Sequence, residues 1–325
     1  MKPAAHAPAG LDIAGAAHGL VVDALAAELM EECERAGAGP ILLKGASLAD
    51  WLYADEVRRY GDCDILIDPD FQGAVSRLLT ERGFEAFDPP RARPGLRHTV
   101  ATAWVRAGAA VDVHLSFWGI GVAPKAAWSI LSACTERAQV ARRSVAVLTP
   151  PGRLVLIALH AAHDGRNAAR PMEDLERALR VASQTEWIEA ARIARALGAE
   201  GAFVAGLRLT SSGVAKAAEL ELPSRPTLAS ALATAGLPMS DGYERLARAQ
   251  SPGELIGVIF GELIPSREFM RWRYRMARRG LRGLLASYLL RGAEVLSTAL
   301  RAGTSWVRLK APGFPFRREG WQKQP

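Results

Sequence analysis

Two hydrophobic patterns alternate in the first 150 residues. Apolar residues recur at helical spacing in three segments, residues 20–36, 45–53 and 70–82. Short apolar runs typical of strands occupy residues 41–43, 62–67, 98–105 and 110–115. Asp70 and Gly83 are suited to cap the third helix at its two ends, and Gly108 falls in a turn between the last two strands. The patterns therefore predict a sheet of about four or five strands backed by helices.

The strand pattern stops after the sequence Thr149-Pro150-Pro151-Gly152. Helical spacing continues in residues 153–163, 172–183, 186–197, 200–210, 228–235, 240–250 and 253–263. This change predicts an α+β fold in which a mixed sheet with helices is followed by an all-α domain. The expected segments are a flexible N-terminus (1–17), an α/β domain (18–150), a helical domain (151–265), a basic amphipathic helical segment (266–310) and a flexible C-terminus (311–325).

Composition narrows the class of protein. Of the 325 residues 49% are apolar, which excludes a chain that is disordered throughout. The apolar runs are far shorter than the roughly 18–20 residues that span a membrane, and the start of the chain predicts no signal peptide. Three widely spaced cysteines, Cys33, Cys63 and Cys134, predict neither a disulfide framework nor a zinc site. We therefore expect a cytoplasmic protein.

Charge is unevenly distributed along the chain. The net charge of +7 divides into +11 for residues 267–325 and −4 for the residues before them. The basic tail mixes arginines with aromatic and aliphatic residues, which suits an anionic membrane surface, nucleic acid or an acidic partner. The favoured interpretation is a solvated basic helix that packs its apolar face on the helical domain, because the apolar residues recur at helical spacing.

Carboxylates gather on two of the predicted strands. Asp62 and Asp64 occupy alternate positions, so their side chains project from one face, and Asp112 and His114 do the same on a later strand. Carboxylates that share a face repel one another unless a cation lies between them, and carboxylate oxygens suit Mg²⁺. An Asp-x-Asp pair alone is a weak signal, because it also occurs at solvated strand ends.

A turn upstream strengthens the signal. Lys44-Gly45-Ala46-Ser47 follows the apolar run at residues 41–43 at a distance that can bring it beside the aspartate pair. Exposed backbone N–H groups in such a turn can hold phosphates. The aspartate pair also opens an apolar strand, where two free carboxylates have no structural reason to be.

The turn, the Asp-x-Asp pair and the third aspartate together resemble an uncharacterised family of nucleotidyltransferases in the DNA polymerase β-like superfamily. The similarity is strongest over residues 41–67 and 111–114, and weaker motifs at residues 159–163, 174–175 and 263–269 extend it across residues 18–290. The superfamily's usual turn is Gly-Ser or Gly-Gly, so the turn of this chain departs from the pattern. The resemblance implies a polymerase β-like nucleotidyltransferase domain.

The resemblance also implies a chemistry. A nucleoside monophosphate would move from a nucleoside triphosphate to an acceptor, with Asp62 and Asp64 holding Mg²⁺ on the triphosphate and Asp112 holding a second ion near the acceptor hydroxyl. The expected nucleotide-binding residues are Lys44, Gly45, Ser47 and Arg58. Each charged residue also has a purely structural explanation. Lys44 fits a lysine whose aliphatic stem covers a strand end, and Arg58 fits a solvated loop. His114 orients a ligand or is a core histidine.

Other interpretations stay open at this point. His160, His163, Asp164 and Asp174 carry part of the pattern of a metal-dependent HD-type phosphohydrolase, although no upstream histidine is suitably placed. A non-catalytic nucleotide-binding protein or an antitoxin-like regulator is the other alternative. The acceptor is a small molecule, a peptide or a protein; nucleic acid is not favoured, because the α/β domain has no basic groove with interleaved aromatic residues. The oligomeric state stays open.

Overall fold

The structure, a computed structural model, describes residues 13–53, 56–87, 100–223, 253, 257 and 264–310, with the backbone alone for 13–16 and 298–310. These residues fall into two compact units. Unit 1 contains the described residues up to 162 together with 166–223, and unit 2 contains residues 163–165 and the described residues from 253 onward. Each unit is described by itself.

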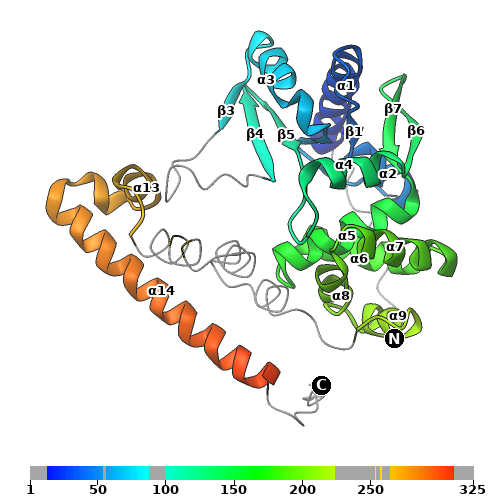
Figure 1. Ribbon diagram of the computed structural model, residues 1–325. Helices are drawn as coiled ribbons and strands as arrows, with labels where there is room; N and C mark the ends of the chain where they lie inside the picture. Colours follow the sequence, from blue (N-terminus) through cyan, green and yellow to red (C-terminus); the bar gives the residue numbers. More distant parts are fainter. Residues whose placement is uncertain are drawn as a thin grey trace, which may run out of the picture. The chain divides into compact units, whose positions relative to one another are not determined.

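Unit 1 is built on a seven-stranded mixed sheet (Figure 1). The strands are β1 (Ile41–Leu42), β2 (Cys63–Leu66), β3 (Glu85–Phe87), β4 (Ala101–Arg106), β5 (Ala109–His114), β6 (Thr135–Val140) and β7 (Arg143–Leu148). Their order is β3-β4-β5-β2-β1-β7-β6. β2 runs parallel to β5 and β1 runs parallel to β7, whereas the other neighbours are antiparallel. The two central strands that carry the predicted aspartates therefore lie side by side.

One face of this sheet is covered by α1 (Ile13–Arg35) and α3 (Gln72–Glu81). The apolar side chains of β2 and β5 alternate toward that face: Cys63, Ile65, Val111 and Val113 are buried in one core with Leu29 of α1. Because side chains of a strand alternate between faces, the residues between them point to the other side of the sheet. Those residues are Asp64 and Asp112.

Helices complete unit 1, to which α5 (Pro150–Asp164) belongs up to residue 162. They are α2 (Ala46–Leu52), a 3₁₀ helix η1 (Pro69–Phe71), α4 (Pro124–Ser132), α5, α6 (Ala169–Val181), α7 (Gln184–Ala196), α8 (Glu200–Leu207) and α9 (Ser211–Glu219). The start of α7 is fixed by a capping box in which the Ser183 hydroxyl accepts from the Glu186 N–H and the Glu186 carboxylate accepts from the Ser183 N–H. The described residues after β7 are helical and contain no strand, which confirms the predicted change from sheet to helices.

The structure corrects several details of the sequence interpretation. The sheet has seven strands instead of four or five, because β3 and the β6–β7 hairpin were not predicted. The first helix begins at Ile13, within the segment expected to be flexible. Asp70 does not cap α3; the Asp68 side chain accepts from the Asp70 N–H and caps η1 instead. Gly83, with φ of 78°, follows the C-cap of α3 as expected.

The predicted boundary at residue 150 coincides with the start of α5, but sheet and helices belong to one compact unit up to residue 223. A division of this part into two domains stays a prediction. The predicted helices at 228–235, 240–250 and most of 253–263, and both predicted flexible ends outside residues 13–17, lie outside the described residues.

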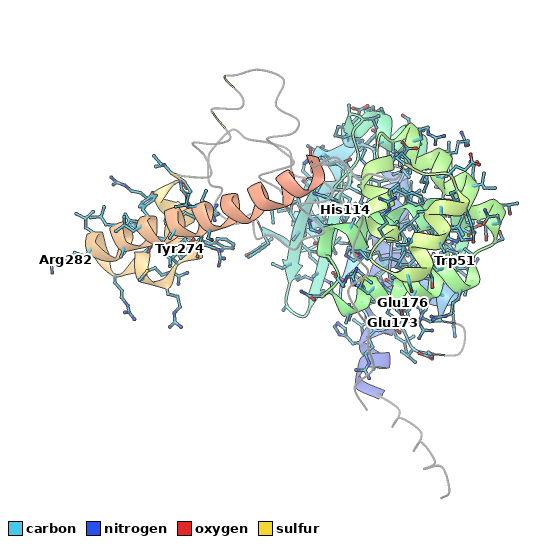
Figure 2. The ribbon with its side chains drawn as sticks, turned by 90° about the horizontal axis from the view of Figure 1, so that it is seen from below. Trp51, His114, Glu173, Glu176, Tyr274 and Arg282 are labelled. Atoms are coloured by element: carbon cyan, nitrogen blue, oxygen red, sulfur yellow. The ribbon has the colours of Figure 1, made fainter. Side chains whose placement is uncertain are left out.

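Unit 2 contains α13 (Arg267–Arg273), a 3₁₀ helix η2 (Arg275–Arg278) and the long helix α14 (Gly280–Lys310). A small core of Met270, Tyr274, Ala277 and Leu284 packs the first two against the start of α14. The Tyr274 hydroxyl donates to Glu294 at 2.6 Å, which ties the turn to the next part of α14. Figure 2 shows the side chains of this unit, with Tyr274 and Arg282 labelled. Of the helices in the described ranges, none combines the length and the apolar character that crossing a membrane requires.

Candidate active site

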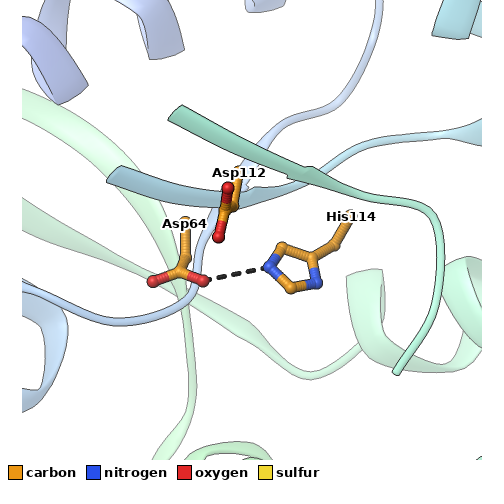
Figure 3. Close-up of side chains that lie close together, drawn as sticks. All are labelled: Asp64, Asp112 and His114. Atoms are coloured by element: carbon orange, nitrogen blue, oxygen red, sulfur yellow. Dashed lines mark hydrogen bonds and ion pairs between the residues drawn. The ribbon is translucent and has the colours of Figure 1, made fainter. Parts of the chain in front are cut away.

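The site forms where β2 and β5 pair in parallel. The register places Asp64 opposite Asp112 and Leu66 opposite His114. Asp112 and His114 are two residues apart on β5, so both side chains project from the face that carries Asp64 (Figure 3). The sequence dictates this arrangement because apolar residues fill the intervening positions and are held by the core on the opposite face.

Asp64, Asp112 and His114 are close enough to share one ion. One carboxylate oxygen of each aspartate and one imidazole nitrogen lie within 4.8 Å of one another, and no other such group of three or more occurs in the described ranges. The imidazole Nε2 is 3.0 Å from Oδ1 of Asp64 (Figure 3), and it must carry the hydrogen because a carboxylate only accepts. The buried Nδ1 of His114 has no hydrogen-bond partner in the described part of the chain.

Lys44 supplies a positive charge to this cluster. It lies two residues after the end of β1, and its Nζ lies 3.0 Å from Oδ1 of Asp64. Asp64 is only 3% exposed, so its charge requires compensation from within the protein. An ammonium and an imidazole N–H provide that compensation on the same carboxylate oxygen.

The two aspartates differ in acidity. Burial alone would raise the pKa of Asp64, but the hydrogen bond with His114 and the charge of Lys44 outweigh burial and lower that pKa below its ordinary value. Burial raises the pKa of Asp112, and the negative charges of Asp64 and Asp62 raise it further. Asp64 is therefore the more persistent anion of the pair, and Asp112 is the more basic carboxylate.

The turn between β1 and α2 lies next to the cluster in sequence and in space. Gly45 is the N-cap of α2 with φ of 64° and ψ of −126°, a backbone conformation that favours glycine. An added Cβ would also meet the ring of Tyr60 at 3.3 Å. The Ser47 hydroxyl is buried and donates to the Leu43 carbonyl at 3.1 Å. Ser47 thus holds the turn closed through its hydroxyl in this structure.

Asp62 lies one residue before β2 and is partly exposed. It is outside the group of ligand atoms that Asp64, Asp112 and His114 form. Its charge nevertheless acts on Asp112, as the raised pKa of that carboxyl records. Its predicted function as a metal ligand stays a prediction.

Arg58 is buried, so the alternative of a solvated loop is wrong, whereas its expected part in nucleotide binding stays a prediction. Its side chain is 3% exposed, and its guanidinium donates to both carboxylate oxygens of Asp174 in α6, at 3.0 and 2.7 Å. The Tyr53 hydroxyl donates to the same carboxylate at 2.7 Å. This buried bidentate pair joins the segment before β2 to α6, and it engages Nε and Nη2 of the guanidinium.

The structure gives two residues contacts that the sequence did not predict. For His114 the sequence leaves open a ligand-orienting residue and a core histidine on the face of Asp112, and the structure adds its contact with Asp64. For Asp174 the sequence suggests a hydrolase ligand or part of a weak motif of the resembled family. Its contact with Arg58 spans 116 positions of sequence, and no local pattern predicts such a pair.

The HD-type hydrolase interpretation gains no support. Asp174, its downstream ligand, is buried and already accepts hydrogen bonds from Arg58 and Tyr53. His163 Nδ1 lies 2.7 Å from Asp164, its neighbour in sequence. Neither His160 nor His163 belongs to a group of three potential metal ligands in the described ranges.

Comparison with known protein families also points to a nucleotidyltransferase. The family of uncharacterised nucleotidyltransferases matches residues 14–213 of the chain. No curated protein matches at a significant level.

Similar solved structures include the antibiotic-resistance factor ANT(2'')-Ia, 12% identical, with 55% of this chain and 92% of that chain covered and a TM-score of 0.38. They also include an antigenic nucleotidyltransferase-like protein from Paracoccidioides brasiliensis, 18% identical, with 56% and 92% covered and a TM-score of 0.34. These scores are too low to carry an argument about substrates. The family match spans more than half of the sequence and includes every predicted site residue. The chain therefore belongs to the family of uncharacterised nucleotidyltransferases.

Proposed function

We propose that this nucleotidyltransferase uses Mg²⁺ to transfer a nucleoside monophosphate from a nucleoside triphosphate to a hydroxyl or phosphate acceptor. The observation that carries the proposal is the juxtaposition of Asp64 and Asp112 on paired parallel strands, with His114 within reach of the same point. Two buried or half-buried carboxylates on one face are costly without a cation. The family match supplies the reaction class.

The donor set fits a hard divalent ion. Asp64 and Asp112 offer carboxylate oxygens, the preferred ligands of Mg²⁺, and we propose Asp62 as a further ligand because its charge already acts on Asp112. When bound, two such ions would neutralise phosphate charge and stabilise the attacking and leaving oxygens of an in-line displacement. His114 is a softer ligand; we assign it to orienting Asp64 through the Nε2 hydrogen bond.

Side chains of the protein would accept the proton, neutralise phosphate charge and position the site. Asp112, whose pKa is raised by burial and by its acidic neighbours, is suited to accept the proton of the acceptor hydroxyl. Lys44 already neutralises one carboxylate at the site and is suited to neutralise a phosphate there. Gly45 and Ser47 shape the turn beside it. For Arg58 we propose a positioning function, because Nε and Nη2 of its guanidinium bond Asp174.

The acceptor class stays broad: a small molecule, a peptide or a protein. The described part of unit 1 gives no reason to prefer nucleic acid. We further propose a reducing compartment such as the cytoplasm, supported by three free cysteines.

Calorimetric titration of the full chain with ATP, GTP, CTP and UTP, with and without Mg²⁺, tests the proposal. At least one nucleotide should bind only with Mg²⁺, and the affinity should fall by about tenfold or more in Asp64→Asn and in Asp112→Asn, because each removes a negative ligand. Lys44→Ala should weaken nucleotide binding but leave its Mg²⁺ dependence intact.

Asp70→Asn is the matched control, since Asp70 is an exposed carboxylate of unit 1 that bonds Lys125 and lies outside the cluster. It should bind nucleotide as the wild type does. Wild-type protein that binds none of the four nucleotides, or variants of Asp64 and Asp112 that bind as tightly as the wild type, would refute the proposed site.

A further inference from the structure

The outward face of α14 carries a row of exposed leucines. Leu281, Leu285, Leu289 and Leu296 are 69%, 57%, 78% and 62% exposed, although large apolar side chains in a folded unit are usually covered. Their spacing of four, four and seven residues places them on one side of the helix. Exposed leucines scattered singly would need no explanation, but an aligned row marks an interaction surface.

This row is distinct from the face that holds unit 2 together. Leu284, Ser287 and Arg291 are buried and follow one another at spacings of three and four residues. At 100° per residue the centre of the buried row lies about 130° around the helix from the centre of the leucine row. The small core with Met270 and Tyr274 therefore already uses one side of α14, and the leucines face away from it.

Arginines surround the start of the leucine row. Between residues 264 and 297 the chain has eight arginines and two glutamates. Arg271, Arg273, Arg275, Arg278, Arg279 and Arg282 are all exposed. Arg282, labelled in Figure 2, lies on α14 at the edge of the row, one residue after Leu281. Trp272, 43% exposed, adds an aromatic ring of the kind that prefers the interface between lipid and water.

We propose that the leucine row, with the arginines around its start, docks the protein on an anionic lipid bilayer, with α14 lying in the plane of the surface. The leucines would enter the boundary between headgroups and acyl chains, while the guanidinium groups pair with lipid phosphates and carboxylates. The charge around the leucine row favours a membrane over a second copy of this chain. A second copy of this unit would bring arginines against arginines, whereas an anionic surface complements them.

Glu294 does not oppose this mode, because it lies on the packed side of α14 and accepts from Tyr274. From Leu281 to Leu296 the row extends about 22 Å along the helix axis, at about 1.5 Å per residue. That length suits a helix that lies on a membrane and is short of the roughly 30 Å needed to cross one.

Co-sedimentation of the full chain with vesicles tests the proposal. One vesicle is pure phosphatidylcholine, and the other is a two-to-one mixture of phosphatidylcholine and phosphatidylserine. The protein should bind the mixed vesicles about tenfold or more tightly than the neutral ones. High salt should weaken that binding, because it screens the arginine charges.

Two variants separate the leucine and arginine contributions. Leu285→Glu/Leu289→Glu should reduce binding about tenfold or more, because it places carboxylates in the contact. Arg279→Gln/Arg282→Gln should reduce binding to mixed vesicles by a similar factor, and it avoids Arg278, whose guanidinium donates to the Arg271 carbonyl within the fold. Ile188→Glu, at a residue of α7 that is 55% exposed, is the matched control and should bind as the wild type does.

Absence of binding to mixed vesicles at low salt would overturn the proposal. Equal binding to both vesicles, or binding that survives Leu285→Glu/Leu289→Glu, would overturn it as well. A wild-type oligomer that this variant dissociates, with no vesicle binding, would assign the leucine row to a second copy instead. Circular dichroism of each variant shows that the fold is kept, and all these readouts are independent of nucleotide transfer.

Discussion

At the scale of single residues, burial decides which charges the fold can hold. Asp64 and Asp174 are both almost fully buried, yet they are compensated in different ways. One oxygen of Asp64 accepts from an ammonium and an imidazole N–H, whereas Asp174 accepts from a bidentate guanidinium and a tyrosine hydroxyl. The first arrangement fits the proposed metal site, and the second joins the segment before β2 to α6.

Removing the Asp174 carboxylate should therefore destabilise the protein. Asp174→Ala leaves the Arg58 guanidinium buried without a partner, and the free energy of unfolding should fall by about 3–5 kcal/mol. The double variant Arg58→Met/Asp174→Leu should lose clearly less free energy of unfolding, because no buried charge remains. Urea denaturation followed by circular dichroism measures both.

Glu189→Ala is the control for that experiment. It breaks an ion pair with Arg192 that is exposed on α7, and it should leave the denaturation midpoint nearly unchanged. If Asp174→Ala is as stable as this control, the buried pair does not stabilise the fold.

Thiol reactivity follows the same rule of burial. Burial raises the pKa of Cys33 from 9.0 to about 12, and it raises the pKa of the fully buried Cys63 well above 9.0. Cys134 is only partly buried. N-ethylmaleimide at pH 8 should modify Cys134 first, and the other two only after denaturation, as peptide mass spectrometry would measure. Modification of native Cys33 at the rate of Cys134 would contradict this burial.

The raised pKa of Cys33 also gives a pH dependence with a definite sign. Above pH 9.0 the thiol ionises in the unfolded chain but stays protonated in the folded one until about pH 12. The unfolded state therefore binds fewer protons in this window, and stability should fall as pH rises through it. Cys33→Ser removes this titration. Between roughly pH 9 and pH 11, the free energy of unfolding of the variant should therefore fall less steeply with pH than that of the wild type.

At the scale of elements, the sequence predicted which side chains alternate along a strand, but it did not predict the number of strands in the sheet. The two-residue period of 62–67 and 110–115 correctly indicated strands that present aspartates on one face. β6 escaped prediction because it carries charged residues, with Glu136 and Arg137 next to each other, and most of its residues are not buried. Its partner β7 is the more apolar strand, but a single short run does not identify a hairpin.

Packing between helices depends on one glycine that no sequence pattern singles out. A Cβ on Gly206 of α8 would lie 2.0 Å from the Ala158 carbonyl oxygen in α5, so the two backbones touch at this point. Gly206→Ala must push the helices apart and should lower the free energy of unfolding by about 1–3 kcal/mol.

Gly73→Ala is the matched control, because a Cβ there meets only the far end of the Arg77 side chain at 4.0 Å. In helix α3 the alanine should leave stability unchanged or raise it by up to about 1 kcal/mol. Thermal unfolding compares the two variants. A Gly206→Ala protein as stable as Gly73→Ala would show that α5 and α8 do not approach as closely as described.

At the scale of the whole molecule, the sequence predicted the α+β fold, the family and the face that bears the aspartates. The reason is physical: alternation fixes side-chain direction wherever one face of a sheet is buried. Contacts far apart in sequence could not be predicted. Nothing near Arg58 in the chain reveals its contact with Asp174. The boundary at residue 150 does not show that α5–α9 and the sheet belong to one compact unit.

The two units carry different proposals, which separate experiments can test. The carboxylate cluster lies in unit 1, and the leucine row lies in unit 2. Substitutions on α14 should therefore change vesicle binding and leave metal binding unchanged, whereas substitutions at Asp64 or Asp112 should do the reverse. Loss of both properties in Asp64→Asn would indicate global unfolding instead of a site defect.

The central claim is that Asp64 and Asp112 hold a divalent cation, and electron paramagnetic resonance of Mn²⁺ tests it most directly. The wild-type chain should bind Mn²⁺, and Mg²⁺ should compete for the same site. Asp64→Asn and Asp112→Asn should each lower the affinity about tenfold or more, whereas Asp70→Asn should not. Wild-type protein that binds no Mn²⁺ with or without nucleotide, or Asp64 and Asp112 variants that bind it as tightly as the wild type, would contradict the account.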